Sequence, residues 1–209
     1  MSQKKRTSKA DATRRDLLDA ALAVIAERGY AAATVDQIVE AAGVSKGVAY
    51  YHFASKADIA ECILVEGVDR LCESFQDIAG HAPTATDALV GMIEDFASFI
   101  FQNAAFGRFF VSELWRTGRP WSDAIRRHQD RLLAVIAGQL ERGQREGTVR
   151  PQIDPAFESV ALVGMVLTTT LYYIDEGAAA EDPLSWDASR QRFVACIVDF
   201  VHHANGGGA

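Results

Sequence analysis

Apolar residues recur at helical spacing along the chain, and stretches that contain glycine or proline interrupt the pattern at intervals. A first helix is predicted over residues 12–28, and Gly29 ends it. After residue 55, the pattern predicts helices at 56–79, 84–103, 105–117, 122–146, 155–176 and 186–204. The breaks are Gly80 with Pro83, the Gly118–Pro120 turn, the Gly147–Pro151 loop and residues 177–183. We therefore expect an all-α fold.

Two much shorter helical patterns lie between residues 34 and 52. Thr34 and Gln37 have the spacing of a capping box, which predicts that a helix starts at Val35. Apolar residues then follow at helical spacing and give one buried stripe: Val35, Ile38, Val39 and Ala42. Gly43 can take a positive φ and is predicted to end this helix.

The second short helix is predicted from Lys46 to His52, with Ser45 as its N-cap. At 100° per residue, Ala49 and Phe53 share one face and can point into a core. Gly47 and Tyr51 point the opposite way, and the residues flanking that ridge are Lys46, Val48, Tyr50 and His52. Glycine costs about 1 kcal/mol in a helix relative to alanine, so a close backbone approach is a plausible reason for Gly47. Two short helices joined by a glycine turn, the second rich in groove-binding side chains, predict a DNA-binding helix-turn-helix.

Ser55 and Asp58 give a third capping signal, which opens a long helix at Lys56. A cation in the first turn opposes the helix dipole, at a penalty of about 0.3–1 kcal/mol. A phosphate held by Lys56 and by free amide groups would explain the arrangement.

The residues TVDQIVEAAGVSKGVAYYHFASK, from Thr34 to Lys56, resemble the DNA-binding domain of the tetracycline-repressor (TetR) family of bacterial regulators. The resemblance is detailed from Asp11 to Ile59 and only architectural beyond. It implies that the following residues contact the backbone or bases of DNA or line its groove: Thr34, Val35, Lys46, Gly47, Val48, Tyr50, Tyr51, His52 and Lys56. The family usually has a bulkier residue where this chain has Ala49, a difference that would loosen or shift the recognition helix.

Charge divides the chain in a way that suits this interpretation. Residues 1–56 carry nine Lys/Arg against six Asp/Glu, whereas the whole chain has a net charge of −7. The acidic remainder would be repelled by phosphate, so the DNA face is expected at the N-terminus. We expect a basic disordered tail at 1–10, the helix-turn-helix domain at 11–56, a helical-bundle domain for ligand binding and dimerisation at 57–204, and a flexible end at 205–209. The basic tail either adds salt-dependent DNA affinity or only solubilises the chain.

An aromatic concentration between Phe96 and Trp121 suggests the walls of an apolar pocket. The candidate pocket residues are Phe96, Phe99, Phe109, Phe110, Trp115 and Trp121, with His128, Met165 and Tyr172. The alternative is that these aromatics simply fill a core. The TetR resemblance implies an effector pocket in this part of the chain. An apolar or aromatic effector is favoured, and nearby acidic residues leave a cationic one open.

The predicted helix at 155–176 is apolar almost all round, so more than one neighbour must cover it. The TetR resemblance implies that the last two helices of each subunit form a four-helix dimer interface. The candidate interface residues are Ala161, Gly164, Val166, Phe193, Ile197 and Phe200. A two-fold dimer would present two recognition helices to successive major grooves of a near-palindromic operator. A bundle formed within one chain is the alternative.

The sequence shows no metal-ligand spacing among its histidines, no glycine-rich phosphate loop and no nucleophile motif. We expect no cofactor, no metal and no catalytic residues. The polar N-terminus shows no signal peptide, and we expect a cytoplasmic bacterial protein. The favoured function is a ligand-responsive regulator, a repressor that binds operator DNA as a homodimer. The alternatives are a helical small-molecule carrier or, remotely, a helical enzyme without DNA binding.

Overall fold

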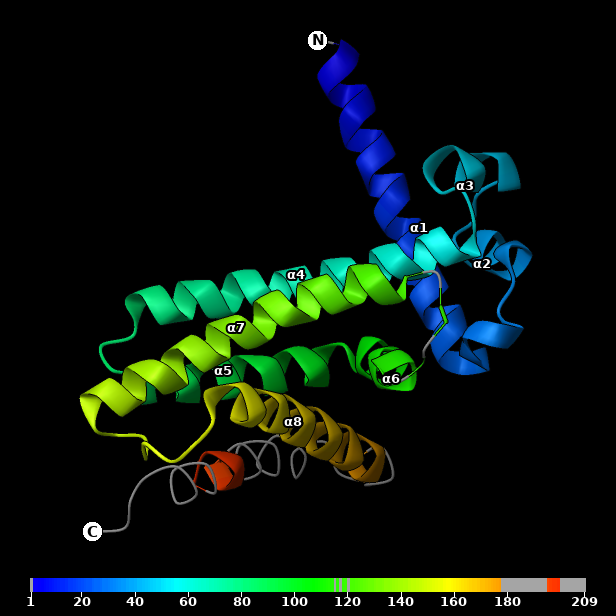
Figure 1. Ribbon diagram of the computed structural model, residues 1–209. Helices are drawn as coiled ribbons and strands as arrows, with labels where there is room; N and C mark the ends of the chain where they lie inside the picture. The colour runs from blue at the N-terminus through cyan, green and yellow to red at the C-terminus, as the bar shows by residue number, and fades with distance from the viewer. Residues whose placement is uncertain (1, 115, 117, 120, 178–194, 200–209) are drawn as a thin grey trace. The chain divides into compact units, whose positions relative to one another are not determined.

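A computed structural model describes residues 2–114, 116, 118–119, 121–177 and 195–199. The described residues form α-helices joined by turns and contain no β-strand (Figure 1), which confirms the all-α prediction. The helices are α1 (Ser2–Ala32), α2 (Val35–Ala41), α3 (Lys46–His52), α4 (Lys56–His81), α5 (Ala85–Gln102), α6 (Ala104–Leu114), α7 (Ser122–Glu146) and α8 (Pro155–Gly177). Residues 195–199 are also helical; the other residues of the helix predicted at 186–204 lie outside the described residues.

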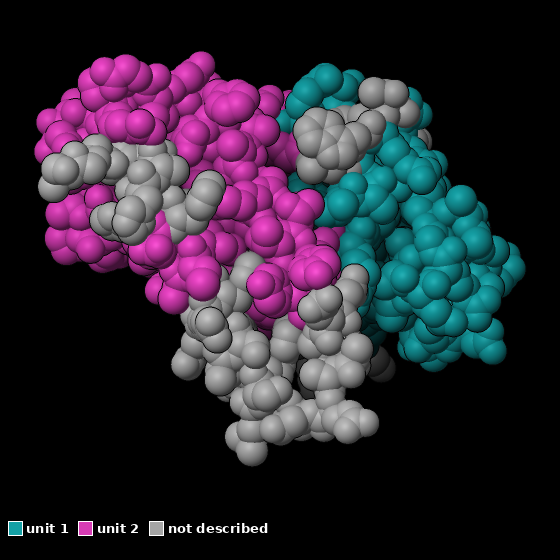
Figure 2. All heavy atoms as spheres, turned by 90° about the horizontal axis from the view of Figure 1, so that it is seen from below, with its two compact units in different colours: residues 1–67, 108–126 teal, residues 68–107, 127–209 magenta. Residues whose placement is uncertain are grey.

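The chain divides into two compact units, coloured separately in Figure 2. Unit 1 comprises residues 1–67 and 108–126, and unit 2 comprises residues 68–107 and 127–209. Unit 1 therefore contains the helix-turn-helix, and it also includes the start of α4 and the segment that joins α6 to α7. The sequence pattern predicted a domain boundary after residue 56, and in the structure the first segment of unit 1 ends eleven residues later, at Gly67.

Helix α1 is longer than the sequence pattern predicted. It begins at Ser2, so the segment expected to be a disordered tail is helical in the structure. Residues 2–10 contain neither glycine nor proline, so no residue there breaks the helix. The predicted stop at Gly29 does interrupt the helix, since this residue has a φ of 77° and a ψ of 152°.

The core of unit 1 is built from the apolar stripes of short helices packed on α1. Leu17, Ala21 and Ile25 of α1 are buried, as are Ile38 of α2 and Phe53 just after α3. Helices of seven residues do not persist alone in water, so α2 and α3 depend on this packing for their existence.

In unit 2, α5 packs along α8 and turns a wide apolar face inward. Its buried residues are Ala85, Ala88, Leu89, Met92, Ile93, Phe96, Ala97 and Ile100. Gly107 of α6 lies close to both helices: an added Cβ would lie 3.1 Å from side-chain atoms of Ile100 and Leu171, which would have to shift by a few tenths of an ångström.

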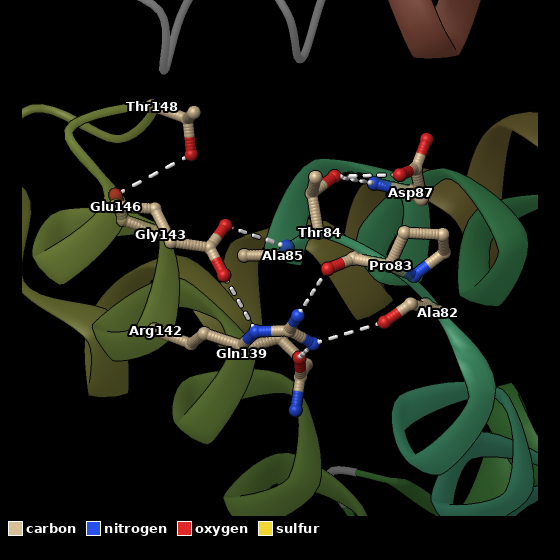
Figure 3. A network of polar contacts seen from close by, with 10 residues as sticks. All are labelled: Ala82, Pro83, Thr84, Ala85, Asp87, Gln139, Arg142, Gly143, Glu146 and Thr148. Atoms are coloured by element: carbon tan, nitrogen blue, oxygen red, sulfur yellow. Dashed lines mark hydrogen bonds and ion pairs between the residues drawn. The ribbon is translucent and has the colours of Figure 1, made fainter.

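A polar network fastens the loop between α4 and α5 to the end of α7 (Figure 3). The Arg142 guanidinium donates to the carbonyl oxygens of Ala82 at 3.3 Å and Pro83 at 2.6 Å, and to the Glu146 carboxylate at 2.6 Å. The other Glu146 oxygen accepts from the backbone N–H of Ala85 at 2.9 Å. This N–H bond, with the help of Arg142, lowers the pKa of Glu146.

Candidate nucleic-acid interface

The capping box predicted for α2 is present in full. The Gln37 N–H donates to the Thr34 hydroxyl at 3.3 Å, and the Thr34 N–H donates to the Gln37 side-chain oxygen at 2.9 Å. Both backbone donors at the start of the helix are thereby satisfied. Gly43 then takes the expected positive φ of 65° between α2 and α3.

Helix α3 is capped by Ser45, whose hydroxyl accepts from the Val48 N–H at 3.4 Å. Its inner face is Ala49, 1% exposed, with Phe53 buried beside it. On the opposite face Tyr51 is 81% exposed, and Tyr50 is half-exposed. The predicted division of α3 into a core face and an outer face is confirmed.

Most of the predicted DNA-contacting residues are accessible in the structure. Thr34, Lys46, Gly47, Tyr50 and Tyr51 are exposed, whereas Val35, Val48, His52 and Lys56 are partly buried. The Tyr51 and His52 rings contact each other edge to face, with centroids 5.1 Å apart. Two short helices thus bring aromatic, hydroxyl and basic groups to one solvent-facing surface.

Gly47 has no explanation inside the protein. A Cβ added there would meet only the Ser45 hydroxyl oxygen, at 3.9 Å, which is an ordinary van der Waals contact. Glycine in a helix is unfavourable relative to alanine, and no contact among the described residues accounts for it here.

The Lys46 ammonium pairs with the Asp36 carboxylate at 2.7 Å, joining α2 and α3. This hydrogen bond raises the pKa of Lys46. Both side chains are exposed, and exposed pairs of this kind contribute little to stability. The lysine can therefore exchange its partner for a phosphate at small cost.

Lys56 is the first residue of α4, as predicted, and its side chain is bonded within unit 1. Its ammonium donates to the carbonyl oxygens of Tyr30 and Ala33, each at 2.8 Å, and lies 4.3 Å from the centre of the Tyr30 ring. Burial, together with the nearby Arg119, lowers the pKa of Lys56. The residue therefore caps carbonyls at the end of α1, and its predicted phosphate contact stays a prediction.

The Tyr30 ring is also contacted by residues between α6 and α7, all within unit 1. The Arg119 guanidinium lies 4.9 Å from the Tyr30 centroid and 5.6 Å from that of Trp121, and its Nε donates to buried Glu113 at 3.0 Å. The Trp121 ring meets Tyr30 edge to face at 4.6 Å. Sequence reasoning missed this cluster, because no local spacing relates residues 30, 56, 113 and 119.

The predicted pocket residues are divided between the two units. Unit 2 contains a small apolar cavity of about 20 Å³, lined by Phe75, Leu89, Met92, Ile93, Phe96, Ile136, Leu162, Val163 and Val166. Of the predicted set, Phe96 alone lines it. Phe109, Phe110 and Trp121 are buried in unit 1, Phe99 packs edge to face on Phe106, Met165 is half-buried, and Tyr172 is exposed. His128 is hydrogen-bonded to Asp69 at 2.6 Å, and Trp115 lies outside the described residues.

Of the predicted dimer-interface residues, some are exposed, some are buried and two lie outside the described residues. Ala161 is exposed and Gly164 has no atom within 4 Å of an added Cβ, whereas Val166 is buried and lines the cavity. Ile197 is buried, and Phe193 and Phe200 lie outside the described residues. Other apolar side chains of α8 are exposed, with Phe157 at 71% and Val160 at 48%. By length and composition alone, Pro155–Ile174 of this helix could cross a membrane, a test that the core helices of soluble proteins also pass.

Comparison with known proteins identifies the family. The sequence model described as "Bacterial regulatory proteins, tetR family" matches residues 17–63, and that of the "Tetracyclin repressor-like, C-terminal domain" matches residues 82–203. The chain belongs to the TetR family. It is therefore a DNA-binding transcriptional regulator and not an enzyme, which sets aside the carrier and enzyme alternatives.

Individual relatives of this TetR-family chain are regulators too. It is 27% identical to the transcriptional repressor KstR2 of Mycolicibacterium smegmatis over 197 residues, 93% of this chain and 94% of that protein. It is 39% identical to the transcriptional regulator SrpR of Pseudomonas putida over 179 residues, 86% of this chain and 81% of that protein. Its fold matches the crystal structure of FadR from Bacillus subtilis in complex with stearoyl-CoA, with a TM-score of 0.73 at 22% identity, over 88% of this chain and 97% of that one.

Proposed function

We propose that the chain is a cytoplasmic repressor that binds a near-palindromic operator as a homodimer and is released by a small, mainly apolar effector. The observation that carries the proposal is the outer face of α3, where Tyr50 and Tyr51 are exposed beside Gly47, at which an added Cβ would have room. These side chains would enter the major groove, and Thr34, Val35, Lys46, Val48 and His52 would flank them.

Lys56 has a positioning role in this proposal. Through the Tyr30 and Ala33 carbonyls it holds the end of α1 against the start of α4, and so sets where α2 and α3 leave the core of unit 1. A phosphate contact by Lys56 would require it to give up part of this cap.

Dimerisation is supported by the composition of α8. Phe157, Val160 and Tyr173 expose apolar surface along this helix, and Ala161 and Gly164 offer small side chains for close helix contact. A second copy of α8 would remove that surface from water and place two α3 helices about 34 Å apart on DNA.

A response to an effector is supported by the extent of α4, which has residues in both units. This single helix carries Lys56 in unit 1 and Phe75, which lines the apolar cavity, in unit 2. An effector that displaces Phe75 would act on the same helix whose first residue, Lys56, is bonded to the end of α1. The coupling is limited to the effector's difference in affinity between the two states, typically about 1–3 kcal/mol.

The test is a titration of the purified protein against DNA flanking its own gene, beside a scrambled fragment, at two salt concentrations. Selective, salt-sensitive binding that is lost in Tyr51→Ala and kept in Glu141→Gln, a change on the exposed surface of α7, is expected. Equal affinity of wild type and Tyr51→Ala for the selected fragment would contradict the assignment of α3.

A further inference from the structure

Glu113 of α6 and Arg119, which follows it before α7, form an ion pair in the interior of unit 1. The Arg119 Nε donates to the Glu113 carboxylate at 3.0 Å, and the Glu113 side chain is only 3% exposed. Removing a carboxylate from water costs free energy that its partner barely offsets, so an apolar pair of similar volume often stabilises a protein as well or better. Stability alone therefore does not account for this pair.

Arg119 also contacts two aromatic rings. Its guanidinium lies 4.9 Å from the centre of the Tyr30 ring and 5.6 Å from that of Trp121. Trp121 is 1% exposed and meets Tyr30 edge to face at 4.6 Å. A planar guanidinium that is bonded to a carboxylate has a fixed position against such rings, which a flexible apolar chain would lack. Arg119 and Trp121 thus orient the Tyr30 ring.

Tyr30 lies where both ends of the helix-turn-helix are attached. It is close to the end of α1, four residues before Thr34, the N-cap of α2. After α3 the chain returns to the same place at Lys56, whose ammonium lies 4.3 Å from the centre of the Tyr30 ring and donates to the carbonyls of Tyr30 and Ala33. Residues 34–55, which contain α2 and α3, therefore begin and end at one cluster.

The cluster is unsuited to contact DNA directly. Glu113 and Trp121 are buried, and the charge of Glu113 would repel a phosphate. A phosphate contact by Arg119 would break its bond to the buried Glu113 carboxylate, which is costly in the interior. Any effect of these residues on DNA binding must therefore pass through α2 and α3.

Resting on the proposed operator recognition, we infer that Glu113, Arg119 and Trp121 are positioning residues for DNA binding. They orient Tyr30, and Tyr30 together with Lys56 sets how α3 presents its outer face. Contacts with base edges specify a sequence and require the helix to lie in register with the bases, whereas sequence-independent binding depends mainly on charge. Loss of the cluster should therefore remove selectivity and leave general DNA affinity in place.

The test compares full-length wild type with Glu113→Leu/Arg119→Met, a double variant that removes both charges and keeps the net charge. The DNA is a fragment that wild type selects from random sequences, beside a scrambled fragment, at two salt concentrations. Affinity for the selected fragment should fall about five- to fiftyfold. Affinity for the scrambled fragment should change less than about twofold, with the same salt dependence. The melting temperature should stay the same or rise, because the buried charges are gone.

The matched control is Asp123→Asn/Arg126→Met, which removes an exposed ion pair of α7 in the same unit and also keeps the net charge. It should change neither affinity. Tyr30→Leu is a second test variant, which keeps the ion pair and removes the ring. It should lower affinity for the selected fragment by a similar factor, and its combination with the double variant should lower it no further, because both act by one route.

Three outcomes would overturn the inference. The first is unchanged affinity for the selected fragment in both the double variant and Tyr30→Leu. The second is an equal loss on both fragments, whether with a flatter salt dependence, which would make Arg119 a phosphate contact, or with a lowered melting temperature, which would make the pair a stabilising element. The third is losses that add in the combined variant. A wild type that selects no sequence would contradict the proposed operator recognition itself, whereas a selective wild type with unaffected variants contradicts this inference alone.

Discussion

The Lys56 ammonium lies 4.3 Å above the Tyr30 ring and donates a 2.8 Å hydrogen bond to the carbonyl of the same residue. The first residue of α4 is thereby attached to the end of α1 by two kinds of interaction at once. The Arg119 guanidinium contacts the same ring at 4.9 Å, so residues between α6 and α7 join this attachment within unit 1. Tyr30 is thus the residue through which three separate segments of the unit are held together.

Replacing Lys56 with Met keeps the side-chain length and removes the donors. We expect a loss of about 1–2 kcal/mol in the free energy of unfolding, because the carbonyls of Tyr30 and Ala33 lose a charged partner. Urea denaturation measures this loss, and Lys46→Met is the matched control, since the exposed Lys46 forms its ion pair with the exposed Asp36. If Lys56→Met leaves stability unchanged yet reduces the salt dependence of DNA binding by about one ion, Lys56 serves as a phosphate contact instead.

Gly47→Ala should separate folding from DNA binding. The added methyl group meets no protein atom closer than 3.9 Å, so the higher helix propensity of alanine should raise stability by up to about 1 kcal/mol. The same methyl should lower operator affinity, because it fills the space that DNA would approach. Thermal denaturation and an operator titration on one preparation test both effects. An alanine variant that binds the operator as tightly as wild type would show that DNA does not approach this backbone.

Tyr51 and Phe53 are two residues apart and should respond oppositely to alanine. Tyr51 is exposed, so Tyr51→Ala should change stability by less than about 0.5 kcal/mol while removing sequence preference. Phe53 is buried in the core of unit 1, and Phe53→Ala should cost about 3–5 kcal/mol. Urea denaturation and DNA binding distinguish the two. A large stability loss in Tyr51→Ala would mean that this side chain packs in the core.

Glu146 should give unit 2 an acid-sensitive contact. Its pKa is lowered from the ordinary value of 4.5 by the Ala85 N–H and by Arg142, so the charged form favours the folded state. The stabilisation is fully present above pH 4.5 and is lost as the pH falls through the lowered value. Glu146→Gln should therefore be less stable than wild type at neutral pH, with the difference shrinking in acid. Denaturation curves at several pH values test this, and a difference that does not change with pH would contradict it.

The exposed apolar residues of α8 should report on self-association. Val160→Glu places a charge on the surface that we propose to be buried between two copies, so we expect the protein to become monomeric and to lose operator affinity. Sedimentation analysis measures the first effect. Glu141→Gln on α7 is the control. A wild-type protein that is itself a monomer at micromolar concentration would contradict the dimer.

Local features of the helix-turn-helix were determined by the sequence alone. The Thr34 capping box, the positive φ of Gly43 and the burial of Ala49 opposite Tyr51 all depend on residues within a few positions of one another. Helical geometry fixes such relationships whatever the rest of the chain does. The break at Gly29 was predictable for the same reason, because it depends on that residue. No residue in the N-terminal tail indicated that α1 begins at Ser2.

Only the tertiary structure decided which element covers each apolar face. Helical periodicity shows that Phe96 and Trp121 are apolar positions, but the packing places one beside a cavity in unit 2 and the other beside Tyr30 in unit 1. The helix dipole at the start of α4 predicted a phosphate partner for Lys56. The tertiary structure adds the carbonyls of Tyr30 and Ala33, which lie 26 and 23 residues earlier in the chain. The unpaired hydroxyl of Thr170 has no trace in the sequence, where it is one of three identical threonines. Contacts between segments far apart in the chain depend on how helices cross, and no spacing within one helix specifies that.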